Sequence, residues 1–541
     1  MHVLVGIVTA VGGAIAAFHY HRLGLTLSHY DARGHLVVAR RIFDSITPGW
    51  QQIGAVWLPL PHLLNALPVQ VDLFYRTGAS AVAISVASFA VTAAAISWIV
   101  ITLTGSVAAS FAALAIFALN PNVLYLQATP MTEPLLLATT TTAVALLIAW
   151  CDSPAAGPRD IARPTLHEIA RLKPRATRVA EIARLKPRAT DVTVDAAQQG
   201  FSVARGFSRA TRWVGWAFAL ACLTRYEAWP ITCCALAAAA WTLWRRGAAP
   251  SDAVRRTAAI ALYPAVAIAG FAVFSRVVVG EWFVTSGFFV PENKSLGQPL
   301  LALKEVGWGV KMLSGTATIW IAAIGVGAMA IGGLISARRS GALGALSLAA
   351  SAALPWSAFV KGHPFRIRYM VPLIAIEAIG AGVLAGLFRR AAIAGSVAIV
   401  LVAAYDLRPF DRSAPMAVEA QWDLPNRAVR QRVTDCLLAR RDGEKIMASM
   451  GSLGHYMQEA SGSGFRISDY LHEGNGDIWL AALDTPEPYV GWILIEEKAE
   501  GGDMLAARAR EQPHWLDGFS RVCEGAGLAL YRRNDKGKSQ P

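Results

Sequence analysis

Long runs of apolar residues alternate with short polar segments along most of this chain of 541 residues. A helix needs about 20 apolar residues to cross the hydrocarbon core of a bilayer, and fewer where the span is broken. Runs that approach or exceed this length lie near residues 3–20, 79–104, 107–119, 134–151, 212–223, 231–244, 257–279, 314–337, 342–360, 369–388 and 391–405. The pattern predicts an α-helical polytopic membrane protein with about eleven transmembrane helices.

The first run does not have the features of a signal peptide. It lacks a basic segment in front, and His21 and Arg22 follow it where a small-residue cleavage site would stand. We therefore expect an uncleaved first span that begins in the cytoplasm.

Composition agrees with insertion into a membrane, because 54% of the residues are hydrophobic, 16% are charged and the mean hydropathy is +0.41. The net charge of +13 comes largely from alternate loops, which is the positive-inside pattern and requires no nucleic-acid partner. These loops contain Arg245, Arg246, Arg255, Arg256, Arg338, Arg339, Arg389 and Arg390. This pattern predicts a cytoplasmic N-terminus and an extracytoplasmic C-terminal tail. The short loops and the alanine-rich composition favour a bacterial inner (plasma) membrane.

Hydropathy divides the chain into a membrane part, residues 1–411, and a soluble tail, residues 412–541. A basic segment over residues 152–211 interrupts the membrane part and repeats EIARLKPRAT at Glu168–Thr177 and Glu181–Thr190. Two copies of this length, each with a proline, cannot bury a core. We expect a disordered cytoplasmic loop. The alternative is a basic patch that binds the anionic inner leaflet.

The tail alternates helix-like and strand-like patterns, which predicts a small α/β domain outside the membrane. Helical periodicity begins at Pro425, and apolar strands are expected at Lys445–Met450, Tyr489–Ile495 and Leu528–Arg532. The glycines of this region lack the strand-to-helix spacing of a dinucleotide-binding loop.

The six cysteines do not have the spacing of a metal-ligand cluster. Cys436 and Cys523 lie in the tail, where an oxidising compartment permits a disulfide, but the sequence does not give the distance between them. The other four lie in or next to apolar runs, where a cysteine usually acts as a small buried hydrophobe.

The polar stretch His29–Leu64 is the most informative part of the chain. It follows the first span and is too polar to cross a bilayer itself. We expect a helix along the membrane surface that ends at Thr47–Gly49. An aromatic and proline-rich run, with Trp50 and Trp57 at the polar–apolar boundary, then turns back toward the lipid.

Asp31 stands at the start of this helix, and His35 follows it by four residues on the same helical face. A carboxylate at this depth could meet a lipid-linked substrate at the interface. The alternative is local, because the segment from Ser28 to Asp31 also resembles a helix start in which the carboxylate caps free backbone amides. Arg40 and Asp44 have the spacing of a surface ion pair.

Two more loops on the same side contain charged residues at the membrane edge. Glu133 is either a solvated acid at a helix start or a second acid beside Asp31. In the next loop Arg225 either pairs with Glu227 or binds an anion, and Tyr226 lies between them.

A strongly basic segment follows the ninth apolar run, on the side where the positive-inside pattern predicts few cations. Its polar and aromatic residues are Lys361, His363, Arg366, Arg368 and Tyr369. The cluster is either accidental or a site for a lipid phosphate, whose oxygens arginine binds in a bidentate manner. We favour the phosphate site.

Taken together, the first outer loop, the runs ARRIFDSITPG, VWLPLPHLL and ATPMTEP, and the late RIRYMVP segment resemble GT-C-type membrane glycosyltransferases. The likeness covers roughly residues 1–405 and is strongest to the branch of protein O-mannosyltransferases and aminoarabinose transferases of lipid A. That family transfers a sugar from a polyprenyl-phosphate donor to an acceptor at the outer membrane face, usually with inversion.

The resemblance implies roles for particular residues. Asp31 matches the catalytic carboxylate, Glu133 the acidic position of the second loop, and Arg366 and Arg368 the region that binds the donor phosphate. Many relatives have a second carboxylate within two residues of the first, where this chain has Arg33. We therefore expect no cofactor, with a divalent metal not favoured.

The expected mechanism assigns Asp31 as the general base for an acceptor hydroxyl, a role typically worth about 10²–10⁴-fold in rate. Fixed cations would stabilise the charge on the leaving phosphate. The expected catalytic residues are Asp31 and Glu133. The expected substrate-binding residues are His35, Arg225, Tyr226, Glu227, Lys361, His363, Arg366, Arg368 and Tyr369. The expected partners are the donor, a lipid, glycan or protein acceptor, and membrane lipids.

Two other functions remain open. Glu377 lies in the middle of an apolar run, where an ionisable residue is costly and often functional, as in a transporter or flippase of a lipid-linked saccharide. The hydropathy shows no inverted repeat to support that interpretation. A non-catalytic scaffold or sugar-binding subunit would tolerate the loss of Asp31.

Overall fold

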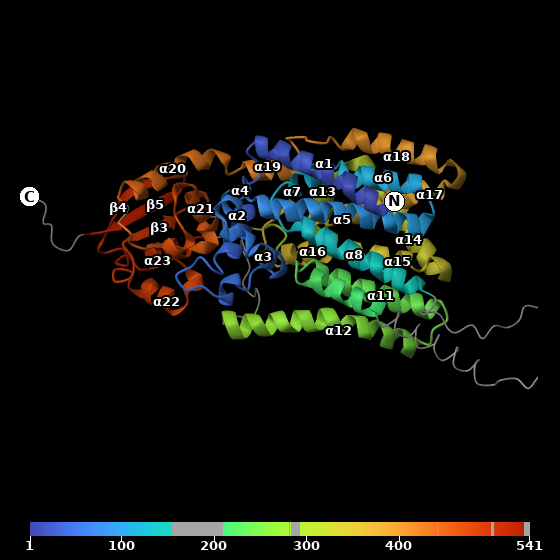
Figure 1. Cartoon of the computed structure of the whole chain (residues 1–541), viewed down its shortest axis with the longest axis horizontal. Helices are drawn as coiled ribbons and strands as arrows, with labels where there is room; N and C mark the ends of the chain where they lie inside the picture. Colours follow the sequence, from blue (N-terminus) through green and yellow to red (C-terminus); the bar gives the residue numbers. More distant parts are fainter. Residues whose placement is uncertain (154–208, 281, 283–292, 441, 499–501, 535–541) are drawn as a thin grey trace, which may run out of the picture.

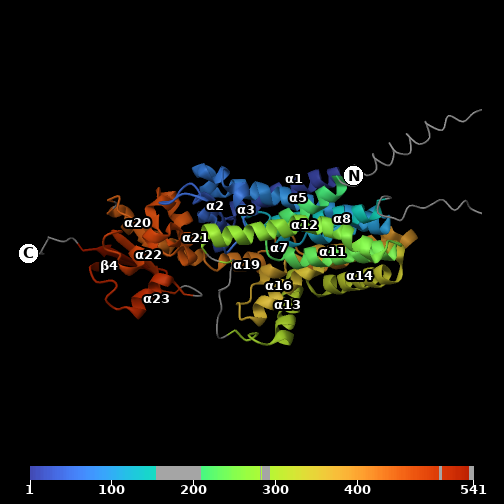
Figure 2. The same ribbon diagram turned by 90° about the horizontal axis from the view of Figure 1, so that it is seen from below.

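The computed structural model describes residues 1–153, 209–280, 282, 293–440, 442–498 and 502–534. A long helical bundle occupies one part of the molecule, and a small domain with a five-stranded sheet packs against one end of it (Figures 1 and 2). The predicted fold class is confirmed. Nearly all of the basic 152–211 segment, including its repeat, lies outside the described residues.

Every predicted apolar run forms helix. Within the described ranges, seven helical segments are long and apolar enough to cross a membrane, and the other four runs form shorter or more polar helices. The helices of the bundle are α1 (His2–Arg22), α5 (Ala79–Thr104), α6 (Val107–Ala118), α8 (Glu133–Asp152), α11 (Ala228–Arg245), α12 (Pro250–Phe274), α14 (Thr316–Ile335), α17 (Leu373–Leu387) and α18 (Ala392–Asp406), together with a helix over residues 209–222.

The helices of the bundle include one broken segment and one that the hydropathy missed. The run over 342–360 is broken into α15 (Ala342–Leu346), the 3₁₀ segment η7 (Ser347–Ala352) and α16 (Ala353–Val360). In addition, α13 (Pro299–Ser314), which the hydropathy did not separate, lies beside α16 and points away from the bundle, roughly at right angles to the long helices (Figure 2). Its mixed composition gives no continuous apolar run, which explains why the pattern missed it.

Helix α17 lies at the centre of the bundle because small residues let its neighbours approach closely. A Cβ on Gly325 of α14 would come within 1.8 Å of the Gly380 carbonyl oxygen, and a Cβ on Gly382 would meet Ala113 of α6 at 2.8 Å. Small residues at helix interfaces are the usual means of close packing in membranes. The tight packing holds α17 against α14 and α6.

The first outer loop is folded more tightly than the sequence predicted. Helix α2 (Tyr30–Arg40) ends at Arg40, so the expected helix through Thr47–Gly49 was wrong. The Arg40 guanidinium binds the Val69 carbonyl oxygen at 3.1 Å and Asp72 at 2.7 Å, which ties the end of α2 to the returning chain. That return consists of η1 (Trp50–Ile53), α3 (Leu60–Asn65), η2 (Pro68–Gln70) and α4 (Asp72–Thr77).

The tail contains a mixed sheet in the order β2-β1-β3-β5-β4, in which β1 is parallel to β2 and β3 while β5 is antiparallel to β3 and β4. The strands are β1 (Ile446–Ala448), β2 (Tyr470–Leu471), β3 (Trp492–Glu496), β4 (Phe519–Gly525) and β5 (Leu528–Arg533). The three expected strands match β1, β3 and β5. The sequence missed β2, which has two residues, and β4, an edge strand with mostly exposed side chains.

Helices cover the sheet, and one covalent bond joins a helix to its edge. The helices are α20 (Leu424–Ala439), α21 (Met450–Ala460), α22 (Asp477–Asp484) and α23 (Met504–Glu511), with 3₁₀ turns η10 (Ser461–Ser463), η11 (Ile467–Asp469) and η12 (Glu473–Asn475). Cys436 of α20 and Cys523 of β4 form a disulfide, the pairing that the sequence left open. Of the other cysteines, Cys151 and Cys222 are buried, whereas Cys233 and Cys234 are exposed on the bundle.

The tail is bound to the first outer loop by buried polar contacts. Arg33 pairs with Glu459 of α21 at 3.3 Å. The predicted pair of Arg40 and Asp44 forms at 2.9 Å, and Asp44 also accepts the backbone N–H groups of Ile467 and Ser468 at 3.3 and 3.1 Å. The expected surface ion pair is therefore also a docking contact for the tail.

The predicted cytoplasmic loops gather at the other end of the bundle, away from the sheet (Figure 1). Arg246 pairs with Asp152 at 2.6 Å and donates to the Ala337 carbonyl oxygen at 3.3 Å. The N-terminus lies at this end as well, whereas the tail lies at the opposite end.

We predict that Asp44→Ala loosens the tail, because two backbone N–H groups lose their acceptor and Arg40 loses a partner. The expected cost to docking is about 1–3 kcal/mol. Amide hydrogen exchange of the segment around Ile467 should become faster, while Asp435→Ala on the exposed side of α20 should leave it unchanged. Equal protection in the wild type and Asp44→Ala would contradict the docking role.

Candidate active site

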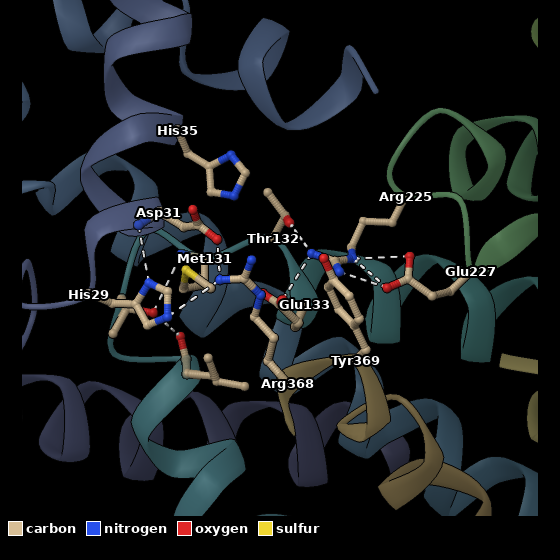
Figure 3. Close-up of polar contacts among 12 residues, drawn as sticks. His29, Asp31, His35, Met131, Thr132, Glu133, Arg225, Glu227, Arg368 and Tyr369 are labelled. Atoms are coloured by element: carbon tan, nitrogen blue, oxygen red, sulfur yellow. Dashed lines mark hydrogen bonds and ion pairs between the residues drawn. The ribbon is translucent and has the colours of Figure 1, made fainter. Parts of the chain in front are cut away.

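The start of α2 leaves the carboxylate of Asp31 available for a tertiary partner. His29 caps the helix instead, because its Nδ1 accepts the backbone N–H of Asp31 at 3.1 Å. The alternative in which the Asp31 side chain serves as the cap was therefore wrong. Its Oδ2 pairs with Nη1 of Arg368, which lies in the 3₁₀ turn η8 (Ile367–Met370) in front of α17 (Figure 3).

A second carboxylate joins this pair from the tail. Since Nδ1 of His29 accepts a hydrogen bond, the proton of the neutral ring lies on Nε2, which faces Oε1 of Glu419 at 3.6 Å. Arg368 Nη1 lies 3.4 Å from the same nitrogen. Glu419 belongs to α19 (Pro415–Gln421), and sequence reasoning missed it because nothing in the local pattern links it to Asp31.

The charge balance keeps both acids ionised. Burial raises the pKa of the Asp31 carboxyl, but Arg368, with His29, His35 and Arg366 around it, outweighs burial and holds the pKa below its usual range. The pKa of Glu419 is also lowered, because His29 and the same arginines outweigh its burial. Asp31 is therefore a carboxylate at neutral pH.

The second group is centred on Arg225. Its guanidinium binds Glu133 at 2.9 Å and Glu227 at 2.6 Å, and it donates to the Thr132 hydroxyl at 2.9 Å (Figure 3). Both acids are buried, with Glu133 0% and Glu227 1% exposed. The expected pairing of Arg225 with Glu227 is present. Glu133 orients Arg225 in this arrangement, which differs from the expected role beside Asp31.

Tyr369 lies between the two groups. The guanidinium of Arg225 is 6.0 Å from the centre of its ring and that of Arg368 is 5.5 Å from it. Both distances are within the range in which a cation is attracted to an aromatic face. The Tyr369 ring therefore contacts both guanidinium groups, which carry the same charge and repel each other.

The remaining expected residues lie around these groups. Tyr226 donates to the Ala55 carbonyl oxygen at 3.3 Å and so holds the first outer loop against the Arg225 loop. His363 Nε2 is 3.4 Å from the Tyr369 hydroxyl. Arg366 is half-buried at the start of η8, and Lys361 is exposed at the end of α16, outside the buried cluster.

Glu377 is buried in α17 beside the Ser314 hydroxyl, deeper in the bundle than the site. Within the described part of the chain, no three or more His, Cys, Asp and Glu side chains come together as metal ligands would. Arg33, two residues after Asp31, pairs with Glu459 and Asp423 of the tail.

Comparison with solved structures identifies the fold. The chain is similar to ArnT from Cupriavidus metallidurans bound to undecaprenyl phosphate, with a TM-score of 0.55 and 12% identity over 97% of each chain. It is also similar to the apo oligosaccharyltransferase of Archaeoglobus fulgidus, with a TM-score of 0.50 and 10% identity over 99% of this chain and 75% of that one. Both have the GT-C glycosyltransferase fold, which this chain shares. No protein-family model and no curated protein sequence matches the chain.

We predict that Arg368→Gln reverses the effect of Asp31 on the pH dependence of stability. In the wild type the pKa of Asp31 is lowered, so its contribution is complete above the unfolded value of about 3.9 and is lost as pH falls through the folded value. Without Arg368, burial dominates and raises that pKa, so the unpaired carboxylate costs about 3–5 kcal/mol at neutral pH.

The measurement is thermal unfolding of the purified protein at neutral and mildly acidic pH. Arg368→Gln should be destabilised at neutral pH and should recover part of the loss on acidification. Arg440→Gln, an exposed matched control, should behave as the wild type. A variant without this recovery would contradict the pairing.

Proposed function

We propose that this protein is an integral membrane glycosyltransferase that moves a sugar from a polyprenyl-phosphate donor to a hydroxyl acceptor. The observation that carries the proposal is the buried pair of Asp31 and Arg368 at the tail-facing end of a GT-C fold. A carboxylate next to a fixed guanidinium provides the two groups that this reaction needs, one for a proton and one for a phosphate.

The chemistry proceeds with inversion. The acceptor oxygen attacks the anomeric carbon, the bond to the phosphate oxygen breaks, and the proton of the hydroxyl passes to Asp31. The lowered pKa makes this carboxylate a weak base, so correct placement matters more than basicity. Donor phosphate that draws Arg368 toward itself would weaken the hold on Asp31 and raise its basicity.

The cations of the late loop are the proposed phosphate site. Arg368 is the innermost, Arg366 lies near the start of the same turn, and exposed Lys361 stands outside as the first cation that an arriving donor meets. Arg225 already binds two glutamates, so we assign it to hold Glu133 and Tyr369 in place.

The undecaprenyl phosphate bound to ArnT supports a polyprenyl-linked donor for this chain. The acceptor is a lipid, a glycan or a protein. The site lies at the end of the bundle that contains the tail, opposite the arginine-rich loops. We therefore place the reaction on the extracytoplasmic face of a bacterial inner membrane, with the N-terminus in the cytoplasm.

We predict that Asp31→Asn lowers sugar transfer by at least about 10²-fold, because the amide cannot take the hydroxyl proton. The assay measures transfer from radiolabelled polyprenyl-phosphate sugars in membranes that contain either protein. Asp477→Asn, an exposed acid of the tail, is the matched control and should retain activity.

Full activity in Asp31→Asn would remove this residue as the base. Movement of labelled donor across the membrane without any transfer would instead support the transporter, and Glu377→Gln would then be the next variant.

We also expect transfer to continue in the presence of a chelator. Arg33, which binds Glu459, replaces the second carboxylate that a metal would need next to Asp31. The measurement compares transfer after EDTA treatment with transfer after readdition of Mg²⁺ or Mn²⁺. Activity that disappears with EDTA and returns with the metal would contradict this expectation.

A further inference from the structure

A pair of buried imidazoles lies next to Asp31 and belongs to neither ion-pair group. His35 of α2 places its Nδ1 3.2 Å from Nε2 of His62 in α3, and His62 Nδ1 lies 3.2 Å from the Leu58 carbonyl oxygen. The side chains are 7% and 1% exposed. The contacts form a chain from a backbone carbonyl, through two rings, to the site.

The Leu58 carbonyl oxygen decides which atom donates and which accepts in each hydrogen bond of this series. A carbonyl oxygen only accepts, so Nδ1 of His62 carries the proton that it donates to Leu58. A neutral His62 then has a lone pair on Nε2, which accepts from Nδ1–H of His35. A neutral His35 therefore has a lone pair on Nε2.

Both rings are neutral near physiological pH. Burial, together with the nearby Arg41, lowers the pKa of His62 to about 3. Burial and the neighbouring His62 lower the pKa of His35 well below its usual range, which Asp31 only partly offsets while Arg225 and Arg368 add to the decrease. The tautomer assigned above is therefore the form that a substrate would meet.

The lone pair of His35 faces the site. Among the described residues, Nε2 makes no hydrogen bond, and Figure 3 shows the ring next to Asp31, with Thr132 across from it. A pocket lies against both rings and is lined in part by Asn65, Ser85 and Thr132. The pocket is small, about 20 Å³, which is room for about one water-sized group such as a single hydroxyl.

Trp57 holds the His35 ring in this orientation. The two rings are 4.2 Å apart, and Trp57 also stacks on His62 at 5.8 Å. A Cβ on Gly34 would lie 3.0 Å from the Trp57 ring, so the glycine permits this close approach. The imidazole has little freedom to turn its lone pair away.

We propose that His35 binds substrate through this lone pair, by accepting a hydrogen bond from an O–H or N–H group of a saccharide next to Asp31. The identification of the ligand as a saccharide rests on the proposed function. The group belongs either to the sugar of the donor or to a glycan acceptor. His62 and the Leu58 carbonyl are positioning groups, because they act only by fixing the tautomer of His35.

The first test is ¹⁵N NMR of the histidine rings in the full-length protein in detergent. His35 and His62 should both carry the proton on Nδ1. A short-chain polyprenyl-phosphate sugar forms the donor arm and methyl glycosides form the acceptor arm, and one arm should shift the Nε2 resonance of His35. A proton on Nε2, or no shift with either arm, overturns the proposal.

Transfer kinetics provide the second test. His35→Phe should lower kcat/KM by about 10- to 100-fold, through the KM of whichever substrate shifts the resonance. His35→Gln should retain part of the activity, because its amide oxygen also accepts. His62→Phe should reproduce part of the loss and change the His35 tautomer, although it does not touch the substrate, whereas His514→Phe at an exposed position should do neither.

A substrate analogue that lacks the contacted group separates binding from folding defects. The wild type and His35→Phe should use this deoxy analogue equally well, and a persistent difference between them would overturn the assignment. A resonance shift without detectable transfer would support the saccharide site and reject the transferase, so the two proposals fail separately.

Discussion

The buried ion pair of Asp31 and Arg368 is the contact on which the arrangement of the site depends. The two residues come from segments that are far apart in the sequence, α2 for Asp31 and η8 for Arg368. Either charge left alone in this buried position would be costly, so the segments that contain them are held together. Because η8 leads directly into α17, and the segment Ile367–Leu387 is the most buried of the candidate spans in the described part of the chain, the ion pair ties Asp31 to the interior of the bundle.

Each ion-pair group combines one arginine with two buried acids, but the contacts differ. Arg225 binds both Glu133 and Glu227 directly. Arg368 pairs directly with Asp31 only, and Glu419 faces His29, which lies next to Arg368. Charge-assisted hydrogen bonds to a guanidinium hold a carboxylate in a fixed direction. The excess negative charge of each group stands next to the cations of the late loop. In the proposed reaction the donor phosphate would meet Arg368, whereas Arg225 keeps its two glutamates.

The tail takes part in this construction. Glu419 of the tail faces His29, and Glu459 of the tail pairs with Arg33. Asp44 of the loop accepts the backbone N–H of Ile467 in the tail. These contacts bind the loop that carries Asp31 from the side opposite the bundle. The loop is thus supported on both sides, which the proposed reaction would need in order to place the base and the phosphate accurately.

Several features of the protein follow from the sequence itself. The apolar runs determined the spans, because a bilayer selects for length and hydropathy, which are local properties. The i, i+4 spacing of Arg40 and Asp44 determined their pairing for the same reason. The partners of Asp31 were decided only by tertiary structure. Arg368 and Glu419 are remote from Asp31 along the chain. In an unfolded chain water weakens the attraction between such distant charges, and burial in the folded protein removes that water. Tertiary contacts also determine where α2 ends and where the short strand β2 and the edge strand β4 form. The local hydropathy pattern contains no sign of these contacts.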